Sequence, residues 1–165
     1  MRRNLIKWAL GGLSLTVLAG AASAQSVVTA KQLSVGVANG IAMAALEQCR
    51  NDGFHVSVAI VDRAGNTQVL LKDNGAGPHT PDTARRKAYT SASFGITSAE
   101  FAKRVSNPGA ATLKDISGVI ALAGAVPIRI GKDLVGGIGI GGAPGGDKDE
   151  ACANAALEKF ASQLK

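Results

Sequence analysis

Apolar residues in the N-terminal part of the chain recur at helical spacing. The recurring positions are Leu33, Val37, Ile41 and Ala45. They share one face of a helix, because residues four apart lie one turn above each other. Thr29–Gln32 has the sequence of a capping box before this face. The pattern predicts a helix that runs to about Arg50 and stops at the Asn-Asp-Gly of residues 51–53.

Alternation of apolar and polar residues replaces this spacing further along. Every second residue of Val56–Ile60 is Val or Ile, which is typical of a half-buried strand. Residues 62–66 are predicted to turn, and Thr67–Lys72 to return as a second strand. Val126–Ile130 and Leu134–Ile140 form a second predicted hairpin, because the residues between them suit a tight turn.

Helix signals surround the first predicted hairpin and follow the second. Thr80 is a predicted N-cap, with Pro81 in the first helical position and Gly95 as the stop. Thr97–Glu100 is a capping box for a short helix that ends before Asn107. Residues 110–122 fit a helix or a strand. A last helix is predicted from Asp147, with Glu150 completing a box at its start, to about Gln163.

The predicted elements follow one another in the order helix, strand pair, helices, strand pair, helix. This order favours an α+β fold with an antiparallel sheet. Gly137, Gly139 and Gly142 match the dinucleotide-binding fingerprint, but no crossover helix and second strand with an acidic residue about 20 positions on can follow before the chain ends at Lys165. We therefore interpret these glycines as places where the strand approaches another backbone closely. There is no internal repeat and no linker.

The first 24 residues have the composition of a secretory signal peptide. Three cations precede an apolar stretch, Trp8–Ala22, and Ala22-Ser23-Ala24 matches a small-residue cleavage site. We expect residues 1–24 to be removed and residues 25–165 to form one domain, periplasmic or secreted. The alternative is an uncleaved anchor, although the stretch is short for a span. No further apolar stretch follows, so no membrane span is expected after cleavage.

Removing the signal halves the net charge. The 165-residue chain has 18 Lys and Arg against 12 Asp and Glu, a net charge of +6, and three of the cations lie in the signal. The mature chain therefore carries about +3, which is too little to indicate nucleic-acid binding. The mature chain is long enough to bury a stable hydrophobic core without a structural metal or other cross-link.

Cys49 and Cys152 are the two cysteines of the chain. In an oxidising compartment a pair is usually bridged. Cys49 lies near the end of the first predicted helix and Cys152 near the start of the last, so antiparallel packing of these helices would bring them together. Two buried thiols are the alternative. No C-x-x-C-H motif is present, which excludes covalent haem attachment of the c type.

Asn74–Phe94 holds the strongest candidate for a ligand site. His79 follows a glycine loop and stands at a predicted helix start, where open N–H groups favour anions and keep an imidazole neutral and able to bind a metal. Arg85, Arg86 and Lys87 follow, but successive helical residues turn by about 100° and cannot face one ligand. Arg86 shares its direction with Thr90. The alternative is a mobile, unliganded loop with solvated cations.

Several short segments, taken in order, resemble one protein family. They are residues 59–66 (AIVDRAGN), 84–90 (A-x-x-K-A-x-T), 124–128 (G-x-x-P-I), 135–142 (VGGIGIGG) and 147–152 (D-x-x-x-A-C). Their order is similar to that of the GlcG/HbpS family, named for a glycolate-operon accessory protein and an extracellular haem-binding protein. The resemblance covers about residues 29–163. It departs at Gly124-Ala125, where the family often has Gly-Gly.

This resemblance implies a profilin-like antiparallel sheet with helices on its faces, and a homo-oligomer. It favours an exported, non-covalent haem-binding protein for haem uptake, storage or redox sensing over an enzyme. His79 is the candidate iron ligand, and Tyr89 could stack on or ligate haem or pack against the sheet. The candidate ligand-binding residues are His79, Thr80, Arg86, Lys87, Tyr89 and Thr90. The alternatives are an enzyme or accessory factor that binds a small carboxylic acid, and a ligand-free oligomeric scaffold.

Overall fold

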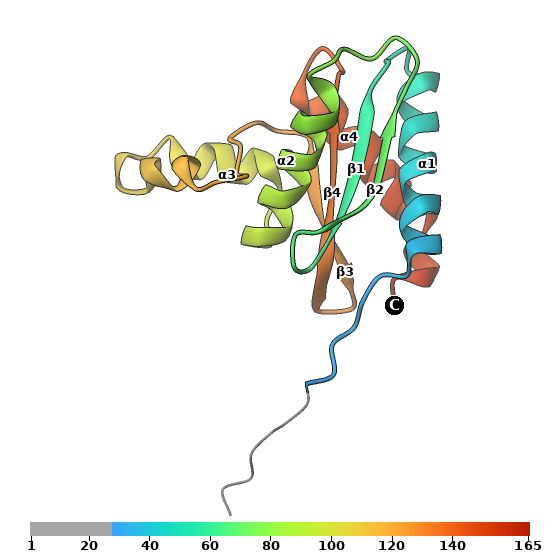
Figure 1. The fold of residues 1–165 in the computed structure, drawn as a ribbon, viewed down its shortest axis with the longest axis horizontal. Helices are drawn as coiled ribbons and strands as arrows, with labels where there is room; N and C mark the ends of the chain where they lie inside the picture. The colour runs from blue at the N-terminus through green and yellow to red at the C-terminus, as the bar shows by residue number, and fades with distance from the viewer. Residues whose placement is uncertain (1–27) are drawn as a thin grey trace, which may run out of the picture.

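Four antiparallel strands form one sheet in the order β2-β1-β4-β3 (Figure 1). The structure is a computed structural model that describes residues 28–165. The strands are β1 (Ser57–Asp62), β2 (Thr67–Lys72), β3 (Ala125–Ile130) and β4 (Asp133–Gly141). Both predicted hairpins are confirmed, and β1 joins them by pairing with β4. The α+β prediction is confirmed.

Helices cover both faces of the sheet. The helices are α1 (Val35–Asn51), α2 (Thr80–Phe94), α3 (Ser98–Val105) and α4 (Gly146–Lys159). α1 and α4 pack on one face, where the largest apolar core lies, and α2 packs on the other. Two short 3-10 helices follow α3 and α4, at Pro108–Asp115 and Ala161–Gln163. α3 and the segment after it project sideways from the sheet (Figure 1).

Three predicted ends of α1 and α4 differ from the structure. α1 begins at Val35 with Ser34 as its N-cap, rather than after Thr29, because the Ser34 hydroxyl accepts the Val37 N–H. α4 begins after Gly145 without a side-chain cap, so the predicted box at its start is not formed. α4 also ends at Lys159, and the chain tightens into a 3-10 turn before residue 163. A short turn of this kind commonly ends a helix.

The close packing of α2 on β4 explains the glycines of that strand. A Cβ placed at Gly139 would collide with the backbone of Ala84 and Ala88, and one at Gly137 with that of Ala88. The facing residues of α2 are alanines, so two backbones approach with almost no side chain between them. The interpretation of these glycines as close-approach positions is confirmed.

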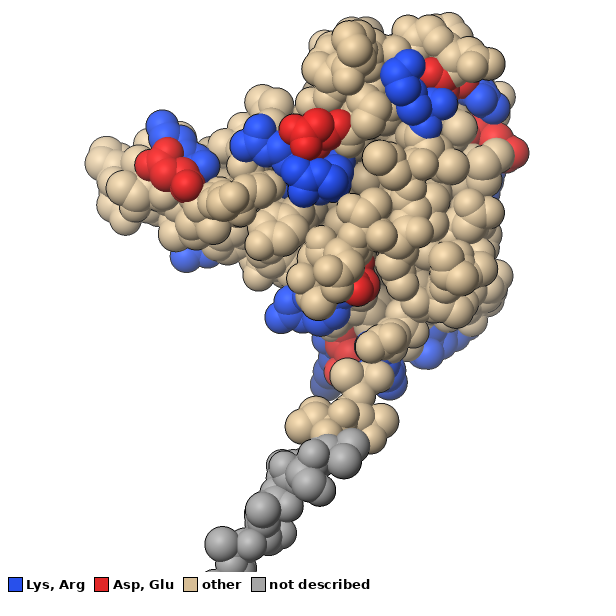
Figure 2. Space-filling model, in the orientation of Figure 1, with Lys and Arg blue, Asp and Glu red and all other residues tan. Residues whose placement is uncertain are grey.

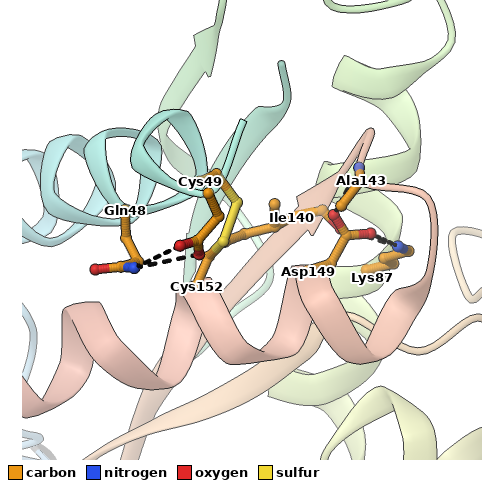
Figure 3. Close-up of a disulfide and its surroundings, with 8 residues drawn as sticks. Gln48, Cys49, Lys87, Ile140, Ala143, Asp149 and Cys152 are labelled. Atoms are coloured by element: carbon orange, nitrogen blue, oxygen red, sulfur yellow. Dashed lines mark hydrogen bonds and ion pairs between the residues drawn. A yellow bond between two sulfur atoms is a disulfide. The ribbon is translucent and has the colours of Figure 1, made fainter. Parts of the chain in front are cut away.

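The predicted bridge between Cys49 and Cys152 is present and joins the two helices of the first face (Figure 3). Their Cα atoms lie 5.6 Å apart. The pairing arises because α1 and α4 pack side by side, as the sequence predicted. The proposed signal peptide, residues 1–24, and the expected mature start at Gln25 lie outside the described residues. Within residues 28–165, no helix is long and apolar enough to cross a bilayer.

Candidate functional site

The start of α2 differs in one respect from its prediction. His79, and not Thr80, occupies the N-cap, and its side chain makes no capping hydrogen bond. Thr80 is the first helical residue and is buried, and its hydroxyl donates to the Gly77 carbonyl at 2.8 Å and pairs with the Ser57 hydroxyl at 2.7 Å. These bonds fix the loop to β1. Thr80 therefore holds the position of His79.

His79 lies exposed at a pocket of about 360 Å³. The pocket is bounded by the start of α2, residues 122–123, and the loop that joins β4 to α4. It is lined by His79, Thr83, Lys87, Leu122, Ala123, Gly141, Gly142, Ala143, Pro144, Gly145, Gly146 and Asp149. The His79 ring lies over Gly77, where an added Cβ would be 2.9 Å from the ring. No hydrogen bond from within residues 28–165 engages the ring nitrogens of His79.

Lys87 lines the same pocket and is buried in an ion pair (Figure 3). Its Nζ lies 2.8 Å from Asp149 Oδ2 and donates to the Ile140 carbonyl at 2.9 Å. The other oxygen of Asp149 accepts the Ala143 N–H at 3.1 Å. Burial raises the pKa of Asp149, and the bonds from Lys87 and Ala143 oppose that rise. The pair thus ties α2, β4 and α4 together at the pocket.

The other two cations of α2 have separate partners, as the 100° rotation between residues predicts. Arg85 pairs with Asp82 on the surface at 2.8 Å. Arg86 donates to the Val119 carbonyl at 2.7 Å. The Thr90 hydroxyl donates to the Arg86 carbonyl at 2.8 Å and accepts the Ile120 N–H at 2.9 Å. Arg86 and Thr90 therefore hold the segment that leads into residues 122–123 of the pocket wall.

Tyr89 packs away from the residues that line the pocket. Its ring is so close to Gly65 and Gly118 that a Cβ at either position would lie 2.6 or 3.3 Å from it. It also contacts the small core that contains Phe101. Tyr89 therefore packs against the segments around Gly65 and Gly118, and its role toward a ligand stays a prediction.

Three further features bear on where a ligand binds. A larger hollow of about 870 Å³ lies among residues 29–32, 62–64 and 133–134, but none of the candidate side chains lines it. Within residues 28–165, no three His, Cys, Asp or Glu side chains are grouped to hold a metal ion. On the face drawn in Figure 2, basic and acidic side chains are interspersed. We therefore take the pocket at His79 as the candidate site.

Comparison with known proteins gives the family. Residues 33–158 match the model of the family described as "Haem degrading protein HbpS-like". The chain belongs to this family, and the resemblance found in its motifs is confirmed. No curated protein matches the chain.

Solved structures agree with this membership. A double mutant of Streptomyces reticuli HbpS is 44% identical over 86% of this chain and 95% of its own, with a TM-score of 0.79. A PduOC:heme complex is 25% identical over 78% of this chain and 94% of its own, with a TM-score of 0.71. The Klebsiella pneumoniae protein ORFY, at 22% identity and a TM-score of 0.77, shares the fold; it covers 83% of this chain and 96% of its own.

Sequence reasoning placed His79 and Lys87 near each other but missed Asp149 and the loop from Gly141 to Gly146. Asp149 lies 62 residues from Lys87 in the chain. The available signal was a set of three acidic residues, Asp147, Asp149 and Glu150, at the start of a helix after a glycine-rich turn. That signal does not indicate a partner, because only the packing of α4 beside β4 brings the two charges together.

Proposed function

We propose that this chain is an exported haem-binding protein in which His79 ligates the iron. Membership of the HbpS-like haem-degrading family supports the ligand class, and so does the relative that was crystallised with haem. The single observation that supports His79 is its position: an exposed imidazole at a pocket, with no partner among residues 28–165. A neutral imidazole is a common axial ligand of haem iron.

The residues present fit haem at the mouth of the pocket. The pocket of about 360 Å³ lies at the small end of the roughly 300–1,000 Å³ that ligand pockets span, so a porphyrin would lie at its mouth. The side chain of Leu122 is 49% exposed beside His79 and offers apolar surface to a ring. When bound, haem would supply iron-centred redox chemistry. The chain would contribute His79 as the iron ligand, Leu122 as an apolar contact, and polar groups at the base of the pocket.

Export and self-association belong to the same proposal. Export is supported by the signal-like N-terminus and by the disulfide, since disulfides persist in oxidising compartments. Self-association is supported by large apolar side chains on the surface, including Ile116 at 47% exposure on the projecting segment. The mature protein would then be periplasmic or secreted. Light scattering would give the size of the assembly.

Titration with hemin tests the proposal. Wild-type protein is expected to develop a saturable Soret band, and His79→Ala is expected to shift that band and weaken binding by about tenfold or more, because an axial ligand is lost. His55→Ala is the matched control, since it removes the other histidine, which lies 3.3 Å from Asp73 and does not line the pocket.

Two outcomes contradict the proposal. A wild-type titration without a saturable band would rule out haem binding. An unchanged band in His79→Ala, with a changed band in His55→Ala, would move the ligand to the other histidine.

A further inference from the structure

One exposed loop holds an Asn-Gly pair, the dipeptide in which asparagine is chemically least stable. Deamidation begins when the backbone nitrogen of the next residue attacks the side-chain amide carbon, and glycine has no side chain to hinder that attack. The chain contains two such pairs, Asn39-Gly40 and Asn74-Gly75. Asn39 lies within α1, where a helical hydrogen bond engages the N–H of Gly40. Asn74 and Gly75 are both exposed and lie outside every helix and strand.

The peptide that joins Asn74 to Gly75 is not held by hydrogen bonds. The Ala76 N–H donates to the Asp73 carbonyl at 3.2 Å and closes a turn around this peptide, with Gly75 at a φ of 84°. Within residues 28–165, neither the Asn74 C=O nor the Gly75 N–H makes a hydrogen bond, and the Asn74 side-chain amide makes none. Glycine also widens the range of backbone angles that the turn can visit. The Gly75 nitrogen can therefore reach the Asn74 side chain without breaking a hydrogen bond.

An imidazole lies beside this peptide. A Cβ placed on Gly75 would be 3.5 Å from Cγ of the His55 ring, an ordinary contact distance. His55 Nδ1 lies 3.3 Å from one oxygen of Asp73, and the other oxygen accepts from Arg50 at 2.6 Å. The ionised carboxylate can only accept hydrogen bonds, so Nδ1 carries the proton and Nε2 is the basic nitrogen. His55 is therefore placed to take the proton that the Gly75 nitrogen loses, directly or through one water.

We propose that Asn74 is a self-modification site, at which the fold promotes conversion of the asparagine to aspartate and isoaspartate with His55 as the base. The Gly75 nitrogen bonds to the side-chain carbon of Asn74 as it gives up its proton. The bond from that carbon to the amide nitrogen breaks, and ammonia leaves with the proton. Water then opens the resulting succinimide ring at one of its carbonyl groups. The reaction consumes water, releases ammonia and needs no oxidant, reductant or cofactor.

The products change the loop that bears His79. Opening the ring at the backbone carbonyl gives isoaspartate, which adds a methylene group to the main chain between residues 74 and 75. Both products place a carboxylate beside Asp73, whose side chain is 3% exposed. The turn between Asp73 and Ala76 cannot keep its geometry in the longer chain. The loop should therefore loosen, whether or not His79 binds haem.

Incubation of the mature, disulfide-bonded protein at neutral pH, followed by peptide mapping with mass spectrometry, tests the inference. The peptide that contains Asn74 should gain the mass difference between an amide and a carboxylic acid, and should separate into aspartate and isoaspartate forms. Asn39 is the internal control with the same dipeptide, and it should stay intact. A parallel incubation of reduced protein in urea gives the rates in the unfolded chain. Asn74 is expected to react faster in the folded protein than in urea, and Asn39 only in urea.

Two variants test the base and the consequence. His55→Ala is expected to slow the reaction at Asn74 by about tenfold, below the roughly 100-fold that a positioned general base contributes in enzymes, because the uncatalysed attack continues. Lys72→Gln is the matched control, since it changes an exposed side chain at the end of β2, beside the same loop, and should leave the rate unchanged. The NMR signals of the His79 ring should move as wild type ages and stay constant in Asn74→Gln.

A rate at Asn74 that is no higher in the folded protein than in urea overturns the inference, even if His55→Ala fails to fold. Equal rates in wild type and in folded His55→Ala overturn the role of the imidazole. The measurement involves no haem, so either result leaves the proposed haem binding standing.

Discussion

At the residue scale, one buried carboxylate anchors the loop that bears His79. Asp73 is 3% exposed and lies at the end of β2. One oxygen accepts from Arg50 at 2.6 Å, and the other lies 3.3 Å from His55 Nδ1. The hydrogen bond from Arg50 is the largest cause that lowers the pKa of Asp73 far below its ordinary value. The ionised form is therefore the form that the folded state favours.

Replacing Asp73 by Asn should destabilise the protein in a pH-dependent way. A carboxylate with a lowered folded pKa contributes its full stability above its unfolded pKa of about 3.9, and loses it as pH falls through the folded value. The melting temperature of Asp73→Asn is expected to be lower than that of wild type at pH 7. The difference should shrink below about pH 4, as thermal unfolding at several pH values would show.

Asp52→Asn is the control for this comparison. Asp52 is exposed and bonds only the Gln48 side chain, so its removal should change the melting temperature little. A difference between Asp73→Asn and wild type that stays constant from pH 7 to pH 2 would show that shape, and not charge, explains the loss.

At the scale of elements, the contact between α2 and β4 depends on missing side chains. Gly139→Ala places a methyl group against the backbone of Ala84 and Ala88, and backbone cannot move aside as a side chain can. Overpacking of this kind typically destabilises by about 1–3 kcal/mol. We expect at least that loss in urea unfolding. The start of α2 should be displaced as well, which would weaken hemin binding.

Gly36→Ala makes the same chemical change where no atom lies within 4 Å of the added Cβ. It sits near the start of α1, and alanine favours a helix over glycine by up to about 1 kcal/mol. Its stability is expected to equal or exceed that of wild type. If Gly139→Ala unfolded at the same urea concentration as Gly36→Ala, the close contact between α2 and β4 would not require a glycine at position 139.

At the scale of the whole molecule, the disulfide links two helices through cysteines that are 103 residues apart in sequence. Closing a loop of that size stabilises by up to about 4–5 kcal/mol in the chain-entropy model. In protein exported with its own N-terminus, unfolding without reductant should expose no free thiol, and reduction should expose two. Reduction is also expected to lower the free energy of unfolding by about 2–5 kcal/mol.

Intact mass before and after reduction checks both halves of this prediction. The oxidised protein should be two hydrogens lighter and should begin at Gln25. Cys49→Ser with Cys152→Ser provides the unbridged control. A wild-type protein whose two thiols label without reductant would show that the disulfide does not form, and a mass that includes residues 1–24 would show that the signal is not cleaved.

Features that depend on neighbours in sequence were determined by the sequence alone. The capping box of Thr97 and Glu100 forms as predicted, because both partners lie within one turn. Gly95 ends α2 with a φ of 66°, a conformation that glycine adopts without a steric penalty. The turn glycines and the alternation of apolar residues predicted the hairpins for the same reason. The capping box predicted at Thr29 was wrong, because the Ser34 hydroxyl caps α1 instead.

Features that depend on contacts across the fold were decided by the tertiary structure. Lys87 looked like its two neighbouring cations, but it alone is buried, because α2 directs it between β4 and Asp149 of α4. Residues 110–122 fitted a helix or a strand, whereas the structure has a 3-10 helix over Pro108–Asp115 with no buried residue and then an irregular segment that buries Val119. The pocket itself joins His79 to a loop more than 60 residues away. Its geometry exists only because α2, β4 and α4 pack together, which no local spacing encodes.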